Sequence, residues 1–388
     1  MKVIYYSKPF FSDCDFPLVK ALQDKGVDVH YYIPLPRKFR RSVLFNFKEP
    51  MMKMRFIKAS SLEDMQIYKD SIDLNRLYFI SGYRYNEKWL PSWIMWFYVI
   101  WHMSRLKADI FHFDWPFSGL FERLIPLWNF KGKKIMTVHD PIPHSGKDGI
   151  KSEKERKDAF KWADEFVLLN KVQSKDFSLR YNIAESKISY SYLGAYDTIA
   201  SVKPIPSGIK EPYILFFGFI AQYKGLEYLL EAMVKVHEQC PELKLVVAGG
   251  GELYFDAAKY MNVDYIEWRH RYIDVPELAG LLKDCEFTIC PYKDATQSGV
   301  IQTAFSMCTP AIATNVGALP KTVSNGETGL IVPPCDVKSL EKAIIQLHQD
   351  KDMLLTMRSN IHGKWMPSMS WNSIADDYIS VYNKVLNQ

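Results

Sequence analysis

The sequence has little of what marks secreted, membrane-spanning or disulfide-stapled proteins. Cysteine occurs only six times in 388 residues and never in a C-x-x-C pair, which is typical of free thiols in a reducing compartment. Cys285 and Cys290 are close in sequence, but no histidine or cysteine cluster accompanies them, which argues against a zinc site. The longest apolar run, Trp93 to Trp101, has nine residues, whereas a membrane span needs roughly 20.

Two N-terminal signatures are missing as well. The first residues, MKVIYYSKPFF, contain no apolar segment ahead of a small-residue cleavage site, so they predict a buried first strand and not a signal peptide. No G-x-G-x-x-G follows that strand, which argues against a nicotinamide dehydrogenase. The sequence therefore predicts a cytoplasmic protein without a membrane span.

Positive charge is concentrated in the first half of the chain. Residues 1–200 hold 32 lysines and arginines against 23 acidic residues, whereas residues 201–388 hold 17 against 21. The densest basic stretch, residues 34–58, interleaves arginine and lysine with phenylalanine and methionine. This mixture fits either an anionic membrane surface or a solvated loop and helix face. No nucleic-acid-binding motif accompanies it, so among partners we favour lipid at the inner face of the cytoplasmic membrane and expect no nucleic acid.

A break between two periodic regions lies at residues 200–212, where three prolines and a glycine interrupt the pattern. On each side, short β-branched or aromatic runs alternate with helical patterns, which predicts parallel sheets covered by helices on both faces. The predicted strands are 3–7, 29–33, 109–113, 134–138, 165–169 and 188–193 before the break, and 213–217, 244–248, 263–267, 287–290, 311–314 and 330–332 after it. We therefore expect an α/β protein of two doubly wound, Rossmann-like domains, residues 1–203 and 208–366, facing a cleft where a ligand binds at the carboxyl ends of the strands.

Two stretches of the second half carry residues suited to phosphate. A strand ends at Gly218, and Lys224 stands at the start of the next helix, where the lysine charge, the free N–H groups and the helix dipole all attract an anion. A loop lysine in solvent is the plainer alternative. Further on, Gly249 and Gly250 follow a buried strand and suit either a base or phosphate lying over the strand end or a tight turn.

The third and most specific stretch is PYKDATQSGVIQTA, which begins at Pro291. Ser298 is the expected N-cap of a helix that ends near Cys308. The N–H groups of Gly299 and Val300 would then point into the cleft, toward the oxygens of a diphosphate-linked sugar.

The order and wording of these stretches resemble the nucleotide-binding half of the family 4 glycosyltransferases. The matching segments are residues 218–225, AGGGE, PYKDATQSGV, TPAIATNVGALP and NGETGLIVPP. The resemblance implies the GT-B fold, in which the C-terminal segment, residues 367–388, packs back on the first domain. It also implies a retaining hexosyltransferase that takes a sugar from a nucleoside diphosphate sugar and needs no metal and no other cofactor.

The resemblance assigns roles to individual residues of the second half. The donor diphosphate and sugar would be bound by Gly218, Lys224, Arg271, Gln297, Ser298, Gly299 and Val300. The nucleotide would be contacted by Gly249, Gly250, Tyr292 and Thr303. Lys224 is expected to be catalytic as well, because it would stabilise the charge that develops on the leaving diphosphate.

The chain departs from the family pattern at three positions. Phe219 stands where the family usually has arginine, and Ala295 and Thr303 stand where it has paired glutamates. The Gln-Ser-Gly-Val wording resembles a subset that tolerates this loss and has an Arg-Tyr-Ile segment before the proline–tyrosine loop. We hypothesise that Arg271, with Arg269 as the alternative, supplies some of the missing positive charge.

The first half resembles the family more loosely, through residues 109–112 and 137–141. His139 ends a buried strand, and the resemblance implies that it is catalytic and faces the donor sugar and the acceptor. His112, Asp114 and Trp115 are expected on the acceptor side. The D-x-D wording at residues 13–15 is a metal signature of a different glycosyltransferase fold, but it follows a Rossmann-type first strand, so we assign no metal to it.

The expected acceptor is a glycan or a polyprenyl-diphosphate-linked sugar, bound by the first domain in surface polysaccharide biosynthesis. The tryptophans of residues 89–106 would suit a lipid-linked acceptor, although aromatic residues at helical spacing predict a core helix. Two alternatives stay open. One is an inactive binding subunit of a polysaccharide assembly complex, motivated by the missing arginine and glutamates, and the other is a nucleotide-sugar epimerase on the same fold.

Overall fold

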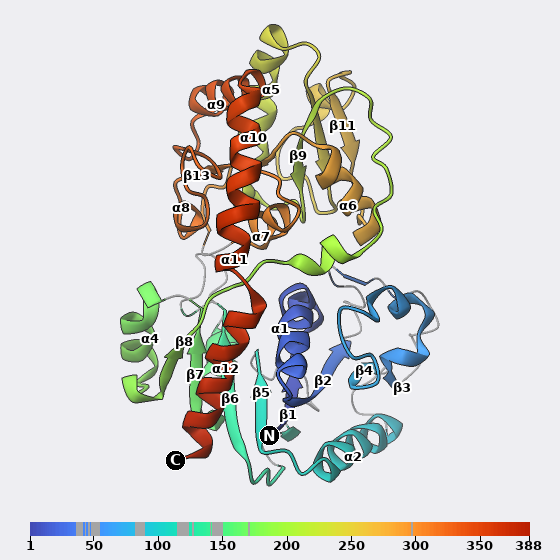
Figure 1. Cartoon of the computed structure of the whole chain (residues 1–388), viewed down its shortest axis with the longest axis vertical. Helices are drawn as coiled ribbons and strands as arrows, with labels where there is room; N and C mark the ends of the chain where they lie inside the picture. Colours follow the sequence, from blue (N-terminus) through green and yellow to red (C-terminus); the bar gives the residue numbers. More distant parts are fainter. Residues whose placement is uncertain are drawn as a thin grey trace. The chain divides into compact units, whose positions relative to one another are not determined.

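The computed structural model describes residues 1–35, 42, 44–45, 47, 55–81, 90–114, 124–125, 128–139, 141, 150–169, 171–295 and 298–388. Contacts divide the chain into two compact units, each with its own sheet (Figure 1). The N-terminal unit consists of Met1–Gly194 together with Trp371–Gln388, and the C-terminal unit is Ala195–Ser370.

The N-terminal unit contains, within the described residues, an eight-stranded sheet in the order β3-β4-β2-β1-β5-β6-β7-β8. Its strands are β1 (Lys2–Tyr6), β2 (Asp28–Leu35), β3 (Arg55–Lys58), β4 (Leu77–Ser81), β5 (Ile110–Phe113), β6 (Lys133–Val138), β7 (Glu165–Leu168) and β8 (Ile188–Tyr190). All of these neighbours pair in parallel except β3, which is antiparallel to β4.

Helices cover both faces of this sheet because consecutive strand residues point to opposite sides. The helices are α1 (Ser12–Asp24), α2 (Leu90–Arg105), α3 (Ile150–Trp162), α4 (Ser174–Tyr181) and α12 (Trp371–Leu386). Trp96 of α2, Phe160 of α3 and Phe177 of α4 share one core with Ile4 and Phe111 of the sheet. On the other face α1 packs against α12, which brings the C-terminal helix back to the N-terminal unit (Figure 1).

The C-terminal unit has, in the part that the structure describes, a six-stranded parallel sheet in the order β11-β10-β9-β12-β13-β14. Its strands are β9 (Tyr213–Phe217), β10 (Lys244–Ala248), β11 (Ile266–Arg269), β12 (Thr288–Cys290), β13 (Ala311–Thr314) and β14 (Gly329–Val332). Its helices are α5 (Leu226–Gln239), α6 (Val275–Asp284), α7 (Gly299–Ser306), α8 (Leu319–Thr322), α9 (Val337–Gln349), α10 (Lys351–Asn360) and α11 (Met366–Ser368).

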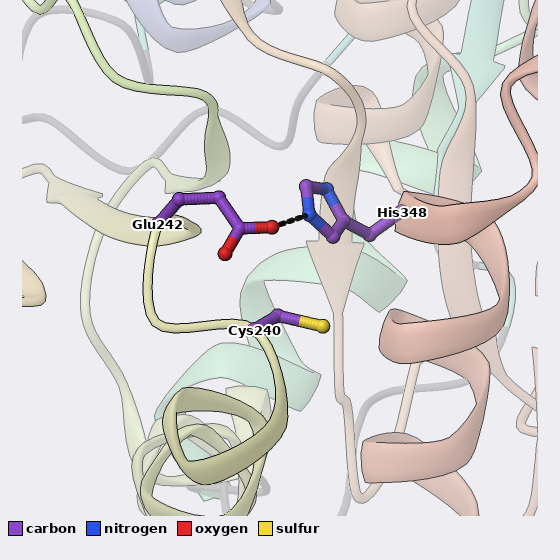
Figure 2. Close-up of side chains that lie close together, drawn as sticks. All are labelled: Cys240, Glu242 and His348. Atoms are coloured by element: carbon purple, nitrogen blue, oxygen red, sulfur yellow. Dashed lines mark hydrogen bonds and ion pairs between the residues drawn. The ribbon is translucent and has the colours of Figure 1, made fainter.

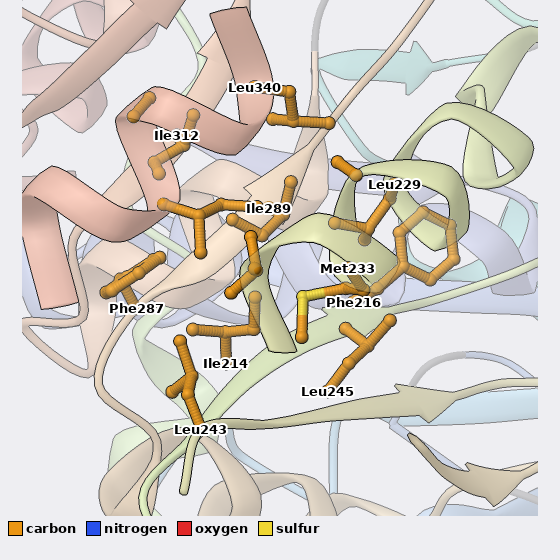
Figure 3. Close-up of a cluster of buried hydrophobic side chains, with 14 of the residues drawn as sticks. Ile214, Phe216, Leu229, Met233, Leu243, Leu245, Phe287, Ile289, Ile312 and Leu340 are labelled. Atoms are coloured by element: carbon orange, nitrogen blue, oxygen red, sulfur yellow. The ribbon is translucent and has the colours of Figure 1, made fainter. Parts of the chain in front are cut away.

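The core of this unit lies between the sheet and the helices α5 and α9. Phe216 and Ile289 of the strands pack against Leu229 and Met233 of α5 and Leu340 of α9 (Figure 3). Ile301 and Phe305 of α7 belong to a second cluster with Cys290 and Ala313. Both faces of the sheet are therefore buried, as near-continuous apolar strands require.

The expectation of an α/β protein with two parallel-sheet domains is confirmed. The units meet in sequence between Gly194 and Ala195, so residues 195–203, which we expected in the first domain, belong to the C-terminal unit. The reason is that the short helix η8 (Asp197–Ser201) packs on α6 and α7.

Two strands of the N-terminal sheet were not predicted. β3 lies inside the basic stretch 34–58, which we interpreted as loop and helix face, and β4 follows it along the chain. The four residues RFIK carry too little pattern to indicate a strand. Their strand conformation depends on pairing with β4, in which Phe56 lies opposite Ile80. The remaining basic positions between 36 and 54 lie outside the described residues.

α2 differs from the predicted core helix on one face. Met95, Trp96, Val99 and Met103 are buried, but the large apolar side chains on the opposite face are exposed. These are Leu90, Ile94, Phe97, Tyr98 and Trp101. None of the helices in the described residues combines the length and hydropathy of a membrane-spanning segment.

Candidate functional site

The carboxyl ends of β9 and β12 bring together most of the residues that we expected to bind the donor. β9 ends at Phe217, and Gly218 follows with a φ of +100°. A Cβ on Gly218 would lie 3.0 Å from Lys224 Nζ and 3.4 Å from Val300 Cγ2. Glycine at this position therefore leaves space between the strand end, the lysine of the short helix η9 (Gln222–Lys224) and the first turn of α7.

Lys224 is a buried cation. Its residue is only 6% exposed, and burial lowers the pKa of its ammonium group to about 8. In the described residues no carboxylate forms an ion pair with it, and its Nζ lies 5.6 Å from the ring centroid of Tyr292. A buried charge without a counter-ion costs free energy, so the position is suited to an anionic ligand that supplies the missing charge.

The first turn of α7 adds N–H donors beside this lysine. Ser298 caps the helix, as predicted: its hydroxyl accepts a hydrogen bond from the Ile301 N–H at 3.4 Å and donates one to the Tyr292 hydroxyl at 3.5 Å. The N–H groups of Gly299 and Val300 come before the first intrahelical hydrogen bond and are free of intrahelical partners. They carry the positive end of the helix dipole, which attracts anions.

Packing explains two of the glycines. A Cβ on Gly249 would lie 1.9 Å from the carbonyl oxygen of Gly218, because the ends of β9 and β10 converge there. A Cβ on Gly299 would lie 2.8 Å from the ring of Tyr196 in the segment before η8. Gly250 lacks such a close neighbour, since its Cβ would be 3.7 Å from the backbone of Arg271. Of these three, Gly250 leaves the most space for a ligand.

Thr303, a predicted nucleotide contact, already hydrogen-bonds within its own helix, so it could only accept a hydrogen bond from the ribose. The residue is buried, and its hydroxyl donates to the carbonyl oxygen of Gly299 at 2.8 Å. A threonine that bonds the preceding turn of its own helix has no proton left for a ribose hydroxyl. Gln297, another predicted donor contact, lies outside the described residues.

Arg271 is already paired. Its guanidinium forms a two-pronged ion pair with Glu277 of α6, with both N···O distances at 2.7 Å, and its side chain is 57% exposed. Arg269 also donates to Glu277, at 3.0 Å, and to Glu267 at 2.7 Å. Arg269 and Arg271 thus share the carboxylate of Glu277. A donor diphosphate would have to compete with this carboxylate for Arg271.

In the N-terminal unit, His139 lies at the carboxyl end of β6 and is half-buried. Its Nε2 lies 3.3 Å from Asp114 Oδ2 at the end of β5. The Phe11 ring stacks on the imidazole with centroids 3.8 Å apart and planes 10° from parallel. His139 and Asp114 therefore form a pair whose ring orientation is held by an aromatic neighbour.

Asp114 belongs to a buried acidic cluster that the sequence did not indicate. Tyr5 Oη lies 3.0 Å from Asp114 Oδ2 and 2.9 Å from Asp15 Oδ1, and Tyr31 Oη donates to Asp15 Oδ2 at 2.7 Å. Burial raises the pKa of the Asp114 carboxyl to about 7. Burial and the nearby Asp114 charge raise the pKa of Asp15 well above its usual range.

The cluster extends to Asp13, whose pKa burial and the Asp15 charge raise to about 7. Asp13 and Asp15 are the two acids of the D-x-D wording, and they occupy the first turn of α1. The sequence shows this pair of acids just after the first strand, but not that they are buried together with Asp114. We had weighed that pair only as a metal motif.

His112, predicted on the acceptor side, is fully buried in the N-terminal unit. Its Nδ1 lies 2.7 Å from Tyr382 Oη of α12, and its Nε2 lies 2.8 Å from Thr137 Oγ1. Burial lowers the pKa of its imidazole to about 3. With both nitrogens occupied and no exposed surface, His112 fastens α12 to the sheet. Trp115 lies outside the described residues.

Comparisons with known proteins find a family resemblance in the second half of the chain. Residues 211–350 match the family model described as glycosyl transferases group 1. An alpha-D-kanosaminyltransferase of Streptomyces kanamyceticus is 25% identical over 182 residues, which cover 45% of this chain and 46% of that protein. A D-inositol 3-phosphate glycosyltransferase of Arthrobacter sp. is 29% identical over 135 residues, or 33% and 32%. The chain thus spans about half the length, or less, of the curated relatives it matches.

Solved structures resemble the chain over its whole length. A sucrose-phosphate synthase from Thermosynechococcus elongatus has a TM-score of 0.69 at 18% identity and covers 100% of both chains. Anabaena Alr3699/HepE in complex with UDP-glucose has a TM-score of 0.67 at 12% identity, over 99% of this chain and 100% of that one. The chain therefore has the GT-B fold.

Proposed function

We propose that this chain, whose residues 211–350 match the group 1 glycosyl transferase model, is a retaining glycosyltransferase that moves a hexose from a nucleoside diphosphate sugar to an acceptor. The observation that carries the proposal is Lys224, a buried ammonium group without a carboxylate partner among the described residues, beside the first turn of α7. The domain match and the UDP-glucose named in the HepE structure support a diphosphate sugar as its anion.

This arrangement favours the transition state over the bound donor. Negative charge grows on the diphosphate as the sugar–oxygen bond breaks, and an oxocarbenium-like centre forms on the sugar. Lys224 and the N–H groups of Gly299 and Val300 are fixed before the reaction, so their attraction strengthens with that charge and no reorganisation is needed. Burial strengthens each of these interactions further.

Retention is proposed to proceed without a carboxylate nucleophile from the C-terminal unit. Ala295 and Thr303 occupy the positions where the family has its glutamates. Attack from the front face then remains, with an oxygen of the departing diphosphate accepting the acceptor's proton. His139, held by Asp114 and Phe11, is proposed to contact the reacting sugar or the acceptor hydroxyl.

The acceptor is proposed to be lipid-linked and presented at an anionic membrane surface, in surface polysaccharide biosynthesis. The support is the exposed apolar face of α2, which ends in a basic group: the Arg105 guanidinium lies 5.2 Å over the Trp101 ring. Lys58 of the adjoining strand β3 and Lys107 are also exposed. α2 itself contains no acidic residue.

The test is release of nucleoside diphosphate from a panel of UDP-, GDP- and ADP-sugars, with and without polyprenyl-diphosphate-sugar acceptors. We expect release that depends on the acceptor, and a product that keeps the anomeric configuration. Binding without release would support the inactive subunit, and isomerised donor without release would support the epimerase. Either result would contradict the proposed transfer.

Lys224→Ala tests the assigned residue. Losing a charge-assisted hydrogen bond costs about 1.5–3 kcal/mol, so kcat/KM should fall about 10- to 100-fold or more. Lys342→Ala, which removes an exposed lysine from α9, is the matched control and should leave kcat/KM unchanged. Wild-type turnover in Lys224→Ala would refute the assignment.

A further inference from the structure

Three side chains of the C-terminal unit converge at a place unrelated to the donor residues. Cys240 follows α5, Glu242 lies in the turn that leads to β10, and His348 is in the last turn of α9. The thiol, one carboxylate oxygen and one imidazole nitrogen all lie within 4.8 Å of one another. Figure 2 shows the contact between the Glu242 carboxylate and the His348 ring, with the Cys240 sulfur below the ring.

The ring of His348 is held in place by a second carboxylate, which contacts the nitrogen on the side away from Glu242. His348 Nε2 lies 2.9 Å from Glu242 Oε1, while Nδ1 lies 2.7 Å from Glu286 Oε2. Glu286 is held in turn by Lys351, whose Nζ is 2.5 Å from Oε1. A carboxylate on the remote ring nitrogen is the usual arrangement for a metal-binding histidine, because it fixes the tautomer and the ring plane.

The donor types and the charges fit a divalent ion. A thiolate, an imidazole and a carboxylate form a mixed set of soft and borderline ligands that suits Zn²⁺ and not Mg²⁺ or Ca²⁺, which prefer oxygen alone. With Cys240 deprotonated, the two glutamates and Lys351 bring the group to a net charge of −2, which Zn²⁺ neutralises. Ligand atoms around tetrahedral zinc lie about 3.5 Å apart, so a small opening of the Glu242–His348 contact would admit the ion.

The cluster lies at the amino ends of the strands, whereas Lys224 lies at the carboxyl ends. Cys240 and Glu242 precede β10, and Glu286 precedes β12, so they stand at the amino ends of strands. Cys240 and His348 are buried, whereas Glu242 is exposed. A surface depression of about 550 Å³ lies next to them: it is lined by Gln349 and Lys351, which hydrogen-bond to Cys240 and Glu286.

We propose that Cys240, Glu242 and His348 bind one Zn²⁺, with Glu286 as the orienting carboxylate and water in the fourth position. The ion would join the α5–β10 turn to the end of α9 and stabilise the C-terminal unit. It takes no part in sugar transfer, so this proposal stands or falls independently of the proposed function.

The experiment is titration of the full-length, metal-free protein with Co²⁺ and Zn²⁺. We expect one Co²⁺ per chain with a thiolate-to-cobalt charge-transfer band, displacement of Co²⁺ by Zn²⁺, and a higher Tm with Zn²⁺. Cys240→Ser should abolish the band and His348→Gln should abolish binding. Glu286→Gln should weaken binding about 10- to 100-fold while the band remains.

The controls keep the test independent of folding defects. Glu242→Gln changes an exposed side chain, so it should fold and yet bind Zn²⁺ more weakly than the wild type. Cys308→Ser removes the thiol that lies 3.8 Å from His362 Nδ1 and should leave the cobalt band intact. Three results would each overturn the proposal: absence of Co²⁺ binding, a band that survives Cys240→Ser, or a band lost in Cys308→Ser. An unchanged Tm on addition of Zn²⁺ would also contradict it.

Discussion

Lys224 carries its positive charge where water has little access, and the consequence is measurable at the scale of one residue. Burial lowers the pKa of its ammonium group to about 8, compared with 10.5 for a free lysine. The protein without ligand is therefore destabilised whenever this lysine is protonated. A diphosphate would relieve that cost, which explains how one side chain can lower stability and support binding.

We predict that Lys224→Met raises the Tm of the ligand-free protein while it lowers kcat/KM about 10- to 100-fold or more. The pKa difference corresponds to at most about 3.4 kcal/mol at neutral pH. The gain should shrink as the pH rises from 8 to 10.5, because the native lysine is then neutral while the unfolded chain still binds the proton. Differential scanning calorimetry at several pH values measures it, with Lys342→Met as control. An unchanged or lower Tm at pH 7 would contradict the buried-charge argument.

The buried carboxyl group of Asp114 should make the stability of the protein depend on pH in the opposite direction. Its pKa is raised to about 7 by burial, so between about pH 4 and pH 7 the native state binds more protons than the unfolded chain. The free energy of unfolding should therefore fall as the pH rises through this window, by at most about 1.4 kcal/mol per pH unit for this group. Asp114→Asn should flatten that dependence in Tm measurements, whereas exposed Asp64→Asn should not. Equal slopes for wild type and Asp114→Asn would refute the assignment.

At the scale of the element, the N-cap residue of α7, Ser298, lies directly beside the N–H groups that we propose bind the donor. Ser298 satisfies the Ile301 N–H and leaves the N–H groups of Gly299 and Val300 without intrahelical partners. The helix is short, from Gly299 to Ser306, so loss of the cap frays a large part of it. Donor binding and helix stability should therefore change together in this element.

We predict that Ser298→Ala costs about 1 kcal/mol of stability and also weakens donor binding severalfold. Asp350→Ala is the matched control: it removes the cap of α10, where the carboxylate accepts from the Met353 N–H at 2.8 Å. That variant should lose similar stability and bind the nucleoside diphosphate normally, as measured by calorimetric titration. Equal donor affinity in both variants would mean that α7 does not contact the ligand.

For the whole molecule, the distribution of charge and apolar surface indicates where it meets its surroundings. Five large apolar side chains of α2 are exposed on one face, and the first half of the chain carries the excess of positive charge. Exposed apolar surface flanked by cations is typical of helices that lie in a membrane interface.

We predict that the protein floats with liposomes that contain anionic lipid and that added salt weakens this binding. The double variant Phe97→Ser/Trp101→Ser should lose most of it, because it removes the two large aromatic side chains from the exposed face. Leu355→Ser, which removes an exposed leucine from α10, should float like the wild type. Flotation that is insensitive to both salt and the α2 substitutions would remove the membrane proposal.

The sequence determined the parallel sheets and the position of Lys224 because their signals are local. Apolar runs of four to six residues that alternate with helical patterns specify buried parallel strands, and the strands β9, β10 and β13 begin and end where the pattern predicted. Ser298 could be recognised as a cap because capping depends on a side chain three residues from its partner.

Tertiary structure alone decided what depends on partners distant in the sequence. β3 is a strand only because β4 pairs with it, and α2 exposes one face only because the sheet covers the other. His112 meets Tyr382 across 270 positions, and Arg271 is neutralised by a glutamate that no motif marked. Burial and the Asp114 charge raise the pKa of Asp15, and burial and the Asp15 charge raise the pKa of Asp13. Burial and long-range pairing are properties of the packed chain, so no local pattern can specify them.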